Sequence, residues 1–95
     1  MKKEATYRKL KLGDISSFKL VYNEFHSQIY FYSLKLVQQE TIAEEITGDV
    51  FLTLWNKRAI IDPSLPIQHF LYKIAKDISY NYIKKLKRDA SLYQA

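Results

Sequence analysis

The sequence predicts an all-α fold, a compact bundle of three main helices. Only two of the 95 residues are glycine and two are proline, whereas 47% are hydrophobic. So few turn-forming residues leave room for few loops and argue against a many-stranded sheet. Apolar residues also recur at spacings of three and four along three long stretches, which is the period of a helix. A chain of this length forms one small domain.

The first main helix is expected from about Ile15 to Val37. Gly13 and Asp14 precede it and are typical of a turn followed by an N-cap. A shorter helix is expected ahead of that turn, around Ala5 to Leu10. One face of the main helix is apolar and is predicted to enter the core; it carries Phe18, Tyr22, Phe25, Ile29, Tyr32 and Leu36.

The second helix is expected to begin at Thr41 and to end near Arg58. Thr41 and Glu44 have the spacing of a capping box, in which each side chain binds the free backbone N–H of the other residue. The predicted core side of this helix consists of Ile42, Ala43, Ile46, Val50 and Leu54.

A loop and a third helix follow. The run Asp62-Pro63-Ser64-Leu65-Pro66 predicts the loop, because each proline disfavours helix in the residue before it. The third helix is expected to start near Pro66, since proline is tolerated at a first helical position, and to continue into the run KKLKR at 84–88. Its apolar side consists of Ile67, Leu71, Ile74, Ala75, Ile78 and Tyr82.

The outer side of the second helix is acidic, although the chain as a whole has a formal charge of +5. At 100° per residue, four residues fall together there, with Glu44 and Trp55 at the edge. One of the four is a glycine, Gly48. A glycine inside a helix costs about 1 kcal/mol relative to alanine, so the presence of Gly48 suggests that a partner approaches the backbone closely. We therefore expect a docking surface for a basic partner; the alternative is a solvated face with one exposed leucine. The four residues are Glu45, Gly48, Asp49 and Leu52.

The outer side of the third helix is basic. Residues 73–88 contain five lysines and one arginine against one aspartate, a local charge of +5. Lysines at this spacing suit phosphates, and an aromatic ring among them suits stacking on an unpaired base. The alternative is a solvated face whose lysines lie along apolar surface. The face consists of Lys73, Lys76, Asp77, Tyr80, Lys84 and Lys87, with Asn81 and Arg88 at its margin.

Several function classes find no support. The absence of cysteine excludes disulfides, thiolate catalysis and cysteine-based zinc sites. His26 and His69 lie on different elements without ligand spacing, and no nucleotide-binding or hydrolase motif occurs, so neither an enzyme nor a cofactor is expected. The N-terminus lacks the apolar core of a signal peptide, and no apolar run approaches the ~20 residues of a membrane span, so we expect a cytoplasmic protein.

Three motifs in order resemble region 2 of bacterial RNA polymerase sigma factors, with the extracytoplasmic-function class as the closest group. They are L-K-x-G-D-x-x-S-F-x-x-x-Y-x-x-F from Leu10, A-E-E-I-x-x-D-V-F-L-x-L-W from Ala43, and F-L-Y-K-I-A-K-D-x-x-x-N-Y-I-K from Phe70. The resemblance covers about Leu10 to Arg88. It implies a sigma region 2-like bundle that acts in transcription initiation.

The resemblance also implies two partners. The acidic helix of the family docks on the clamp-helix coiled coil of the largest subunit of core RNA polymerase, which here corresponds to Glu45, Gly48, Asp49 and Leu52. The loop and the third helix recognise the promoter minus-ten element and hold its opened non-template strand. By position, this DNA-binding role corresponds to Ile61, Asp62 and Ser64 in the loop at 61–66, and to Lys73, Lys76, Asp77, Tyr80, Asn81, Lys84 and Arg88 on the helix.

The chain departs from the family pattern at several positions. Gly48 stands where the family usually has glutamine, Asp77 where it commonly has asparagine, and Phe70 where it has tryptophan. Family members also carry a second, helix-turn-helix domain, which is absent from residues 1–95, so we expect a domain of a longer sigma factor. An anti-sigma factor remains open as a further partner.

Two other functions remain open on the sequence. One is a helix-turn-helix reader of duplex DNA, which is disfavoured because the basic residues cluster towards the C-terminal half of the third helix. The other is a helical protein-interaction module without a nucleic-acid role.

Overall fold

The computed structural model of the chain describes residues 2–94 and is helical almost throughout. The elements are α1 (Lys2–Lys11), α2 (Ile15–Val37), α3 (Glu40–Asn56), the short 3₁₀ helix η1 (Arg58–Ile60) and α4 (Ile67–Gln94). No strand occurs within residues 2–94. The predicted all-α fold is therefore confirmed, including the short helix ahead of the three main ones.

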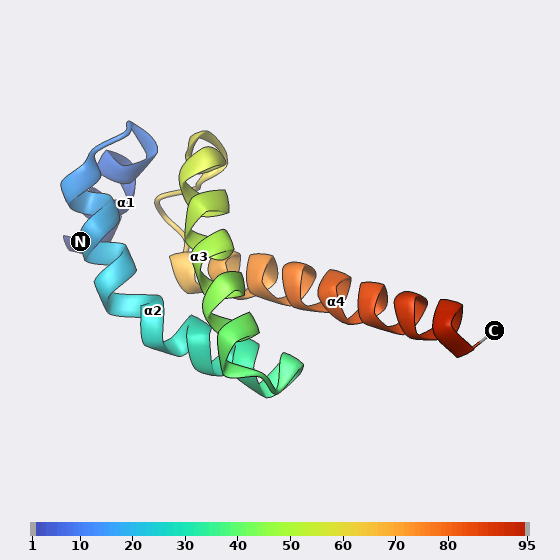
Figure 1. The fold of residues 1–95 in the computed structure, drawn as a ribbon. Coiled ribbons are helices and arrows are strands. Elements are labelled where there is room, and N and C mark those ends of the chain that lie inside the picture. Colours follow the sequence, from blue (N-terminus) through green and yellow to red (C-terminus); the bar gives the residue numbers. More distant parts are fainter. Residues whose placement is uncertain (1, 95) are drawn as a thin grey trace.

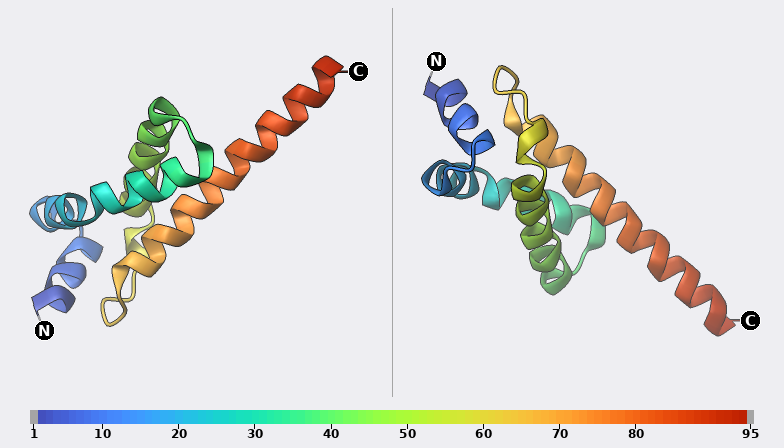
Figure 2. Two further views of the ribbon diagram at one scale, coloured as in Figure 1. Left: turned by 90° about the horizontal axis from the view of Figure 1, so that it is seen from below. Right: turned by 90° about the horizontal axis from the view of Figure 1, so that it is seen from above.

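Helices α2, α3 and α4 pack against one another, and α1 lies against α2 and η1 (Figure 1). The C-terminal part of α4 projects beyond the other helices, which Figure 2 shows from two further directions. This projection explains the elongated dimensions of 55 × 22 × 19 Å. None of the helices in residues 2–94 is long and apolar enough to cross a membrane.

Both ends of α2 lie where the sequence predicts them. At the start, Gly13 has a φ of +94°, and the Asp14 side chain accepts a hydrogen bond from the Ser17 backbone N–H. At the end, Gln38 adopts the left-handed conformation with a φ of 59°, and its N–H donates to the Leu34 carbonyl oxygen at 2.7 Å. This conformation reverses the chain, so that α3 begins two residues later and packs along α2.

The bounds of the other helices differ from the predicted ones. The prediction of a capping box at Thr41 and Glu44 is wrong. Helix α3 begins at Glu40, and its N-cap residue is Gln39, whose side chain makes no capping hydrogen bond. Thr41 therefore lies inside the helix and does not cap it. At the other end α3 stops at Asn56, and Arg58 belongs to η1. Helix α4 begins at Ile67 as expected but continues past 88 to Gln94.

The core lies where α2, α3 and α4 meet. The predicted apolar sides of α3 and α4 are confirmed in the main, since Ala43, Ile46, Val50, Leu54, Ile67, Leu71, Ile74 and Ala75 are all buried, with Ile42, Ile78 and Tyr82 packed against them.

The core face of α2 agrees with the prediction at its centre and differs at its two ends. Phe25 and Ile29 are buried as predicted, whereas the buried residues before them are Ser17 and Val21 and those after them are Ser33 and Val37. Tyr22 is 37% exposed, because its ring lies on the flank of the helix, 4.8 Å from the Phe51 ring of α3. Phe18 lies on the same flank against Trp55, at 5.4 Å between ring centroids. Phe18 and Tyr22 thus pack sideways onto α3, whereas Phe25 and Ile29 lie in the buried centre together with smaller residues.

Candidate nucleic-acid and protein interfaces

The acidic strip, defined as Glu45, Gly48, Asp49 and Leu52, lies entirely on the exposed side of α3. Leu52 is 58% exposed, which is high for a leucine. A Cβ atom placed on Gly48 would meet no atom within 4 Å. No neighbouring residue of the described chain therefore requires this glycine, and the helix backbone is open to a partner at this point.

The acidic strip ends in an apolar hollow that sequence reasoning missed. Leu52 and Trp55 of α3 line it together with Ile15 and Phe18 of α2, around a volume of about 350 Å³. The guanidinium of Arg58 stacks over the Trp55 ring at 4.3 Å and donates to the Trp55 carbonyl oxygen at 2.9 Å. The sequence had already placed Leu52 and Trp55 on the outer side of their helix, but it gave no sign that Ile15 and Phe18 of α2 would lie beside them.

The loop at 61–66 is ordered by a local turn. The Asp62 carboxylate accepts hydrogen bonds from the backbone N–H of Ser64 at 3.0 Å and from its hydroxyl at 2.7 Å. This is the pattern of an Asx turn. These bonds, first from the side chain and then from the backbone, lower the pKa of Asp62, and the charge of Lys11 acts in the same direction. Asp62 is therefore ionised at neutral pH.

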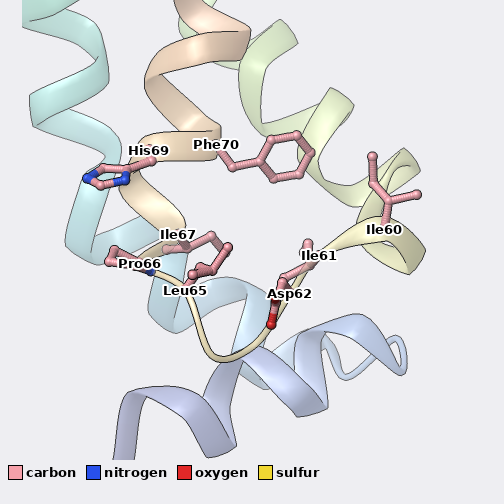
Figure 3. A pocket seen from close by; sticks show the side chains of 8 residues that line it. All are labelled: Ile60, Ile61, Asp62, Leu65, Pro66, Ile67, His69 and Phe70. Atoms are coloured by element: carbon pink, nitrogen blue, oxygen red, sulfur yellow. The ribbon is translucent and has the colours of Figure 1, made fainter.

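A pocket of about 270 Å³ opens between this loop and the first turn of α4. Figure 3 shows that the Phe70 ring extends from α4 on one side, with the Ile60 side chain beyond it and Asp62 on the side of the loop. The wall is mostly apolar, and Asp62 supplies a charged acceptor. The pocket, called the loop pocket below, is lined by Ile60, Ile61, Asp62, Leu65, Pro66, Ile67, His69 and Phe70.

The loop residues predicted to bind DNA fall into two groups. Asp62 and Ser64 are exposed, whereas Ile61 is 4% exposed and belongs to the hydrophobic core. The Ile61 side chain therefore anchors the loop and is not presented to solvent as a contact. Sequence reasoning missed Ile60, His69 and Phe70 as pocket residues, because they lie outside the loop at 61–66 and only the packing of η1 and α4 against it brings them to the pocket.

The basic face of α4 is exposed as predicted. Within it, the Lys76 ammonium lies 5.7 Å from the centre of the Tyr80 ring, and Tyr80 is 44% exposed. Arg88 approaches Asp89 at 3.9 Å, an exposed contact of little energetic value. The exposed members of the face are Lys73, Lys76, Asp77, Tyr80, Asn81, Lys84, Lys87 and Arg88.

The loop pocket and the basic face share one side of α4, because Phe70, Asp77 and Lys84 recur at a spacing of seven residues, about two helical turns. The pocket lies at the N-terminal end of α4, and Lys84 follows Phe70 by about 21 Å at the rise of an α-helix. The link between α3 and α4 extends from 57 to 66, including η1. It is longer than the 3–4-residue turn that a helix-turn-helix requires, so α3 and α4 do not form that motif.

The fold and the site describe a class of all-α bundle that carries an acidic strip on one helix, and a loop pocket leading to a basic face on the next. The comparison with protein families identifies the class. The family described as Sigma-70 region 2 matches residues 21–89, well over half of the chain. The chain therefore belongs to the sigma-70 region 2 family, which is involved in binding core RNA polymerase and in promoter melting. No similar protein was found among curated proteins.

Family membership confirms the resemblance and the all-α fold together. The extracytoplasmic-function class remains a prediction, since the match extends to region 2 of the sigma-70 family as a whole.

Proposed function

We propose that this chain docks on the clamp helices of core RNA polymerase through α3 and captures the melted non-template strand of the minus-ten element through α4. The chain supplies no catalytic group in this role and acts by coupling two binding events. The observation that carries the proposal is the continuity of the loop pocket with the basic face along one helix. Together they suit a strand whose phosphates lie on the lysines and whose unpaired base enters the pocket.

The docking half of the proposal rests on the acidic strip and the apolar hollow beside it. Glu45 and Asp49 are exposed acids that a basic coiled coil would neutralise. Leu52 is an exposed apolar residue that belongs to the acidic strip and also lines the hollow. Charge pairs at a rim set the orientation and rate of association, whereas buried apolar contacts supply most of the affinity. Gly48 lets the partner approach the helix backbone.

The DNA half rests on chemistry suited to an unpaired base. Phe70 provides a ring for stacking, and stacking on an aromatic side chain contributes about 1–3 kcal/mol per base. Asp62 provides an ionised acceptor that can receive a hydrogen bond from an exocyclic amino group, such as N4 of cytosine. A paired base in a duplex offers neither its face nor its pairing edge, so this pocket favours single strands.

Fluorescence anisotropy tests the DNA half. The non-template minus-ten strand and its duplex are compared, together with single strands that carry one abasic position each. We expect weak binding, with a higher affinity for the single strand than for the duplex. Among the abasic strands, we expect one to bind more weakly than the others; its missing base marks the position called the captured position below. Asp62→Asn should change which base is preferred there, because the amide both donates and accepts a hydrogen bond.

Two matched variants separate the pocket from the phosphate contacts. Phe70→Ala should weaken strands with a base at the captured position and leave the abasic strand unchanged. Lys84→Ala should weaken both equally. Equal binding to single strand and duplex, or no binding at low salt, would contradict the DNA half and favour a protein-interaction module.

A further inference from the structure

The Trp55 wall of the apolar hollow lies against a cation, the Arg58 guanidinium. Arg58 is the first residue of η1, shortly after the end of α3, and it is half-buried. Its guanidinium lies 4.3 Å from the centre of the Trp55 ring, within the distance of a cation–π contact. Arg58 therefore covers one face of a ring that lines the hollow.

Two further contacts fix the Trp55 ring. The same guanidinium donates a hydrogen bond to the Trp55 carbonyl oxygen at 2.9 Å. That oxygen belongs to the last turn of α3, where carbonyl groups have no N–H partner within the helix and where a cation interacts favourably with the helix dipole. The ring also meets the Phe18 ring of α2 in an edge contact, at 5.4 Å between centroids and 73° between planes. The indole is thus held between α2 and η1.

Arg58 also lies against the turn that leads into α2. A Cβ atom placed on Gly13 would lie 3.6 Å from Arg58 Nε and 3.8 Å from Arg58 Nη2, which is van der Waals contact. Gly13 is followed by the N-cap residue Asp14 and then by Ile15, which lines the hollow. One guanidinium therefore contacts both Trp55, which is one wall of the hollow, and the turn that places Ile15, which is another.

The charge of Arg58 does not suit direct contact with the proposed partner. The coiled coil of the polymerase is expected to be basic, so a free cation beside the docking surface would repel it. The guanidinium is instead engaged by the ring and the carbonyl group of Trp55. Its contribution is therefore to the shape of the hollow, and attraction of the partner is left to the acidic strip.

We infer that Arg58 is a positioning residue for polymerase docking, which holds Trp55 and Ile15 in the arrangement that forms the apolar hollow. The inference rests on the proposed docking of α3 on the clamp helices. The hollow then receives an apolar side chain of the coiled coil, while the acidic strip pairs with basic residues beside it. Apolar anchors in such pockets supply much of the affinity of an interface. Release of the Trp55 ring should therefore weaken docking, although no charge of the acidic strip changes.

The test is Arg58→Lys in the 95-residue chain, because lysine keeps the charge and lacks the planar group that stacks on the ring. Two quantities are measured: the affinity for core polymerase, and the quenching of Trp55 fluorescence by acrylamide in the free chain. Trp55 is the only tryptophan of the sequence, so this fluorescence reports on one ring. We expect stronger quenching and an affinity about three- to tenfold lower, the range of one exposed cation–π contact or one hydrogen bond. Helical content by circular dichroism should not change.

Two further variants separate position from charge. Arg58→Gln removes the cation, so an effect of charge alone would strengthen binding to the basic coiled coil, whereas the positioning role predicts weaker binding. Arg8→Lys, at an exposed arginine of α1, is the matched control and should change neither affinity nor quenching.

A double-mutant cycle tests whether Arg58 acts through the ring. Trp55→Leu keeps an apolar side chain and removes the aromatic face. Arg58→Lys should lower polymerase affinity in the unsubstituted chain and have little further effect in Trp55→Leu. Two losses that simply add would overturn the inference.

Each remaining result also has a definite meaning. Unchanged quenching in Arg58→Lys would overturn the inference, whatever the polymerase result. Stronger quenching with unchanged polymerase affinity would overturn the link to docking. An equal loss of single-strand DNA binding would also overturn it, because Arg58 would then act through η1 and the loop. If the unsubstituted chain does not bind core polymerase, the docking half of the proposed function has itself failed, and the quenching data still decide whether Arg58 holds the ring.

Discussion

The acidic strip of α3 and the basic face of α4 differ in more than charge. The acidic strip is short, contains a glycine with open space above it, and ends in an apolar hollow shared with α2. The basic face follows a helix that projects beyond the bundle, and it begins at a pocket. The first is built like a protein contact, with an apolar centre and a charged margin. The second is built like a track for a polyanion.

Two helices that pack together in this way can serve two ligands without competition. Each ligand is attracted to the face of opposite charge and repelled by the other, because a charged surface steers its partners before contact. The comparison therefore predicts that substitutions on one face leave the other function intact.

Charge reversal on the acidic strip should have the largest effect. Asp49→Lys should weaken binding to core polymerase by about 1–3 kcal/mol, because it places a cation against a basic partner. DNA binding and the helical content should not change, since Asp49 is exposed. Pull-down and titration with core polymerase at moderate salt measure the loss.

The matched control is Asp77→Lys, at an exposed acid of the basic face. It should leave polymerase binding unchanged and strengthen DNA binding. Full retention of polymerase by Asp49→Lys would show that the acidic strip is not the docking surface.

Removal of a lysine from the basic face should have a smaller effect. Lys84→Ala should weaken binding to all single strands several-fold at low salt. It should also reduce the slope of log affinity against log salt by about 0.7, the value for one phosphate contact on a single strand. Anisotropy at a series of salt concentrations gives both quantities. Lys19→Ala, at an exposed lysine of α2, is the control and should change neither.

Gly48→Ala tests why the acidic strip contains a glycine. Open space around the Cβ position predicts a more stable bundle, by up to about 1 kcal/mol. If the polymerase approaches the backbone here, affinity for it should fall at the same time. Thermal melts and polymerase titration are measured together. Gly13→Ala should instead destabilise the bundle, because Gly13 has a positive φ. Unchanged polymerase affinity in Gly48→Ala would mean that the polymerase does not approach the helix backbone closely at this position.

The smallest expected effect is the pH dependence of stability that arises from Asp62 in the loop. The pKa of Asp62 is lowered from 3.8 by the Ser64 hydrogen bonds, so its stabilising contribution is present above that value and is lost as the pH falls through the lowered one. Ser64→Ala should raise the Asp62 pKa towards its ordinary value and reduce the loss of stability in acid. Carboxyl titration by NMR measures the shift, with Ser16→Ala as the control. An unchanged Asp62 pKa would contradict this account.

Much of this protein follows from the sequence alone. Apolar residues at helical spacing determine the three main helices and most of their core sides, because burial of an apolar face is what stabilises a helix in water. Charged side chains avoid burial, so the sequence also predicted that the acidic strip and the basic face would be exposed. The start of α2 was predictable because the turn at Gly13 and Asp14 is a local signal.

The tertiary structure decided what depends on contacts between distant residues. The left-handed Gln38 turns the chain so that α3 packs along α2, and α3 then begins at Glu40 in spite of the capping-box pattern at Thr41. The position of Phe18 and Tyr22 beside the buried centre of α2, and not in it, depends on their packing against α3. The hollow that Tyr7 of α1 lines together with Pro66 of the loop requires segments some sixty residues apart to meet, and spacing along the chain carries no information about such contacts.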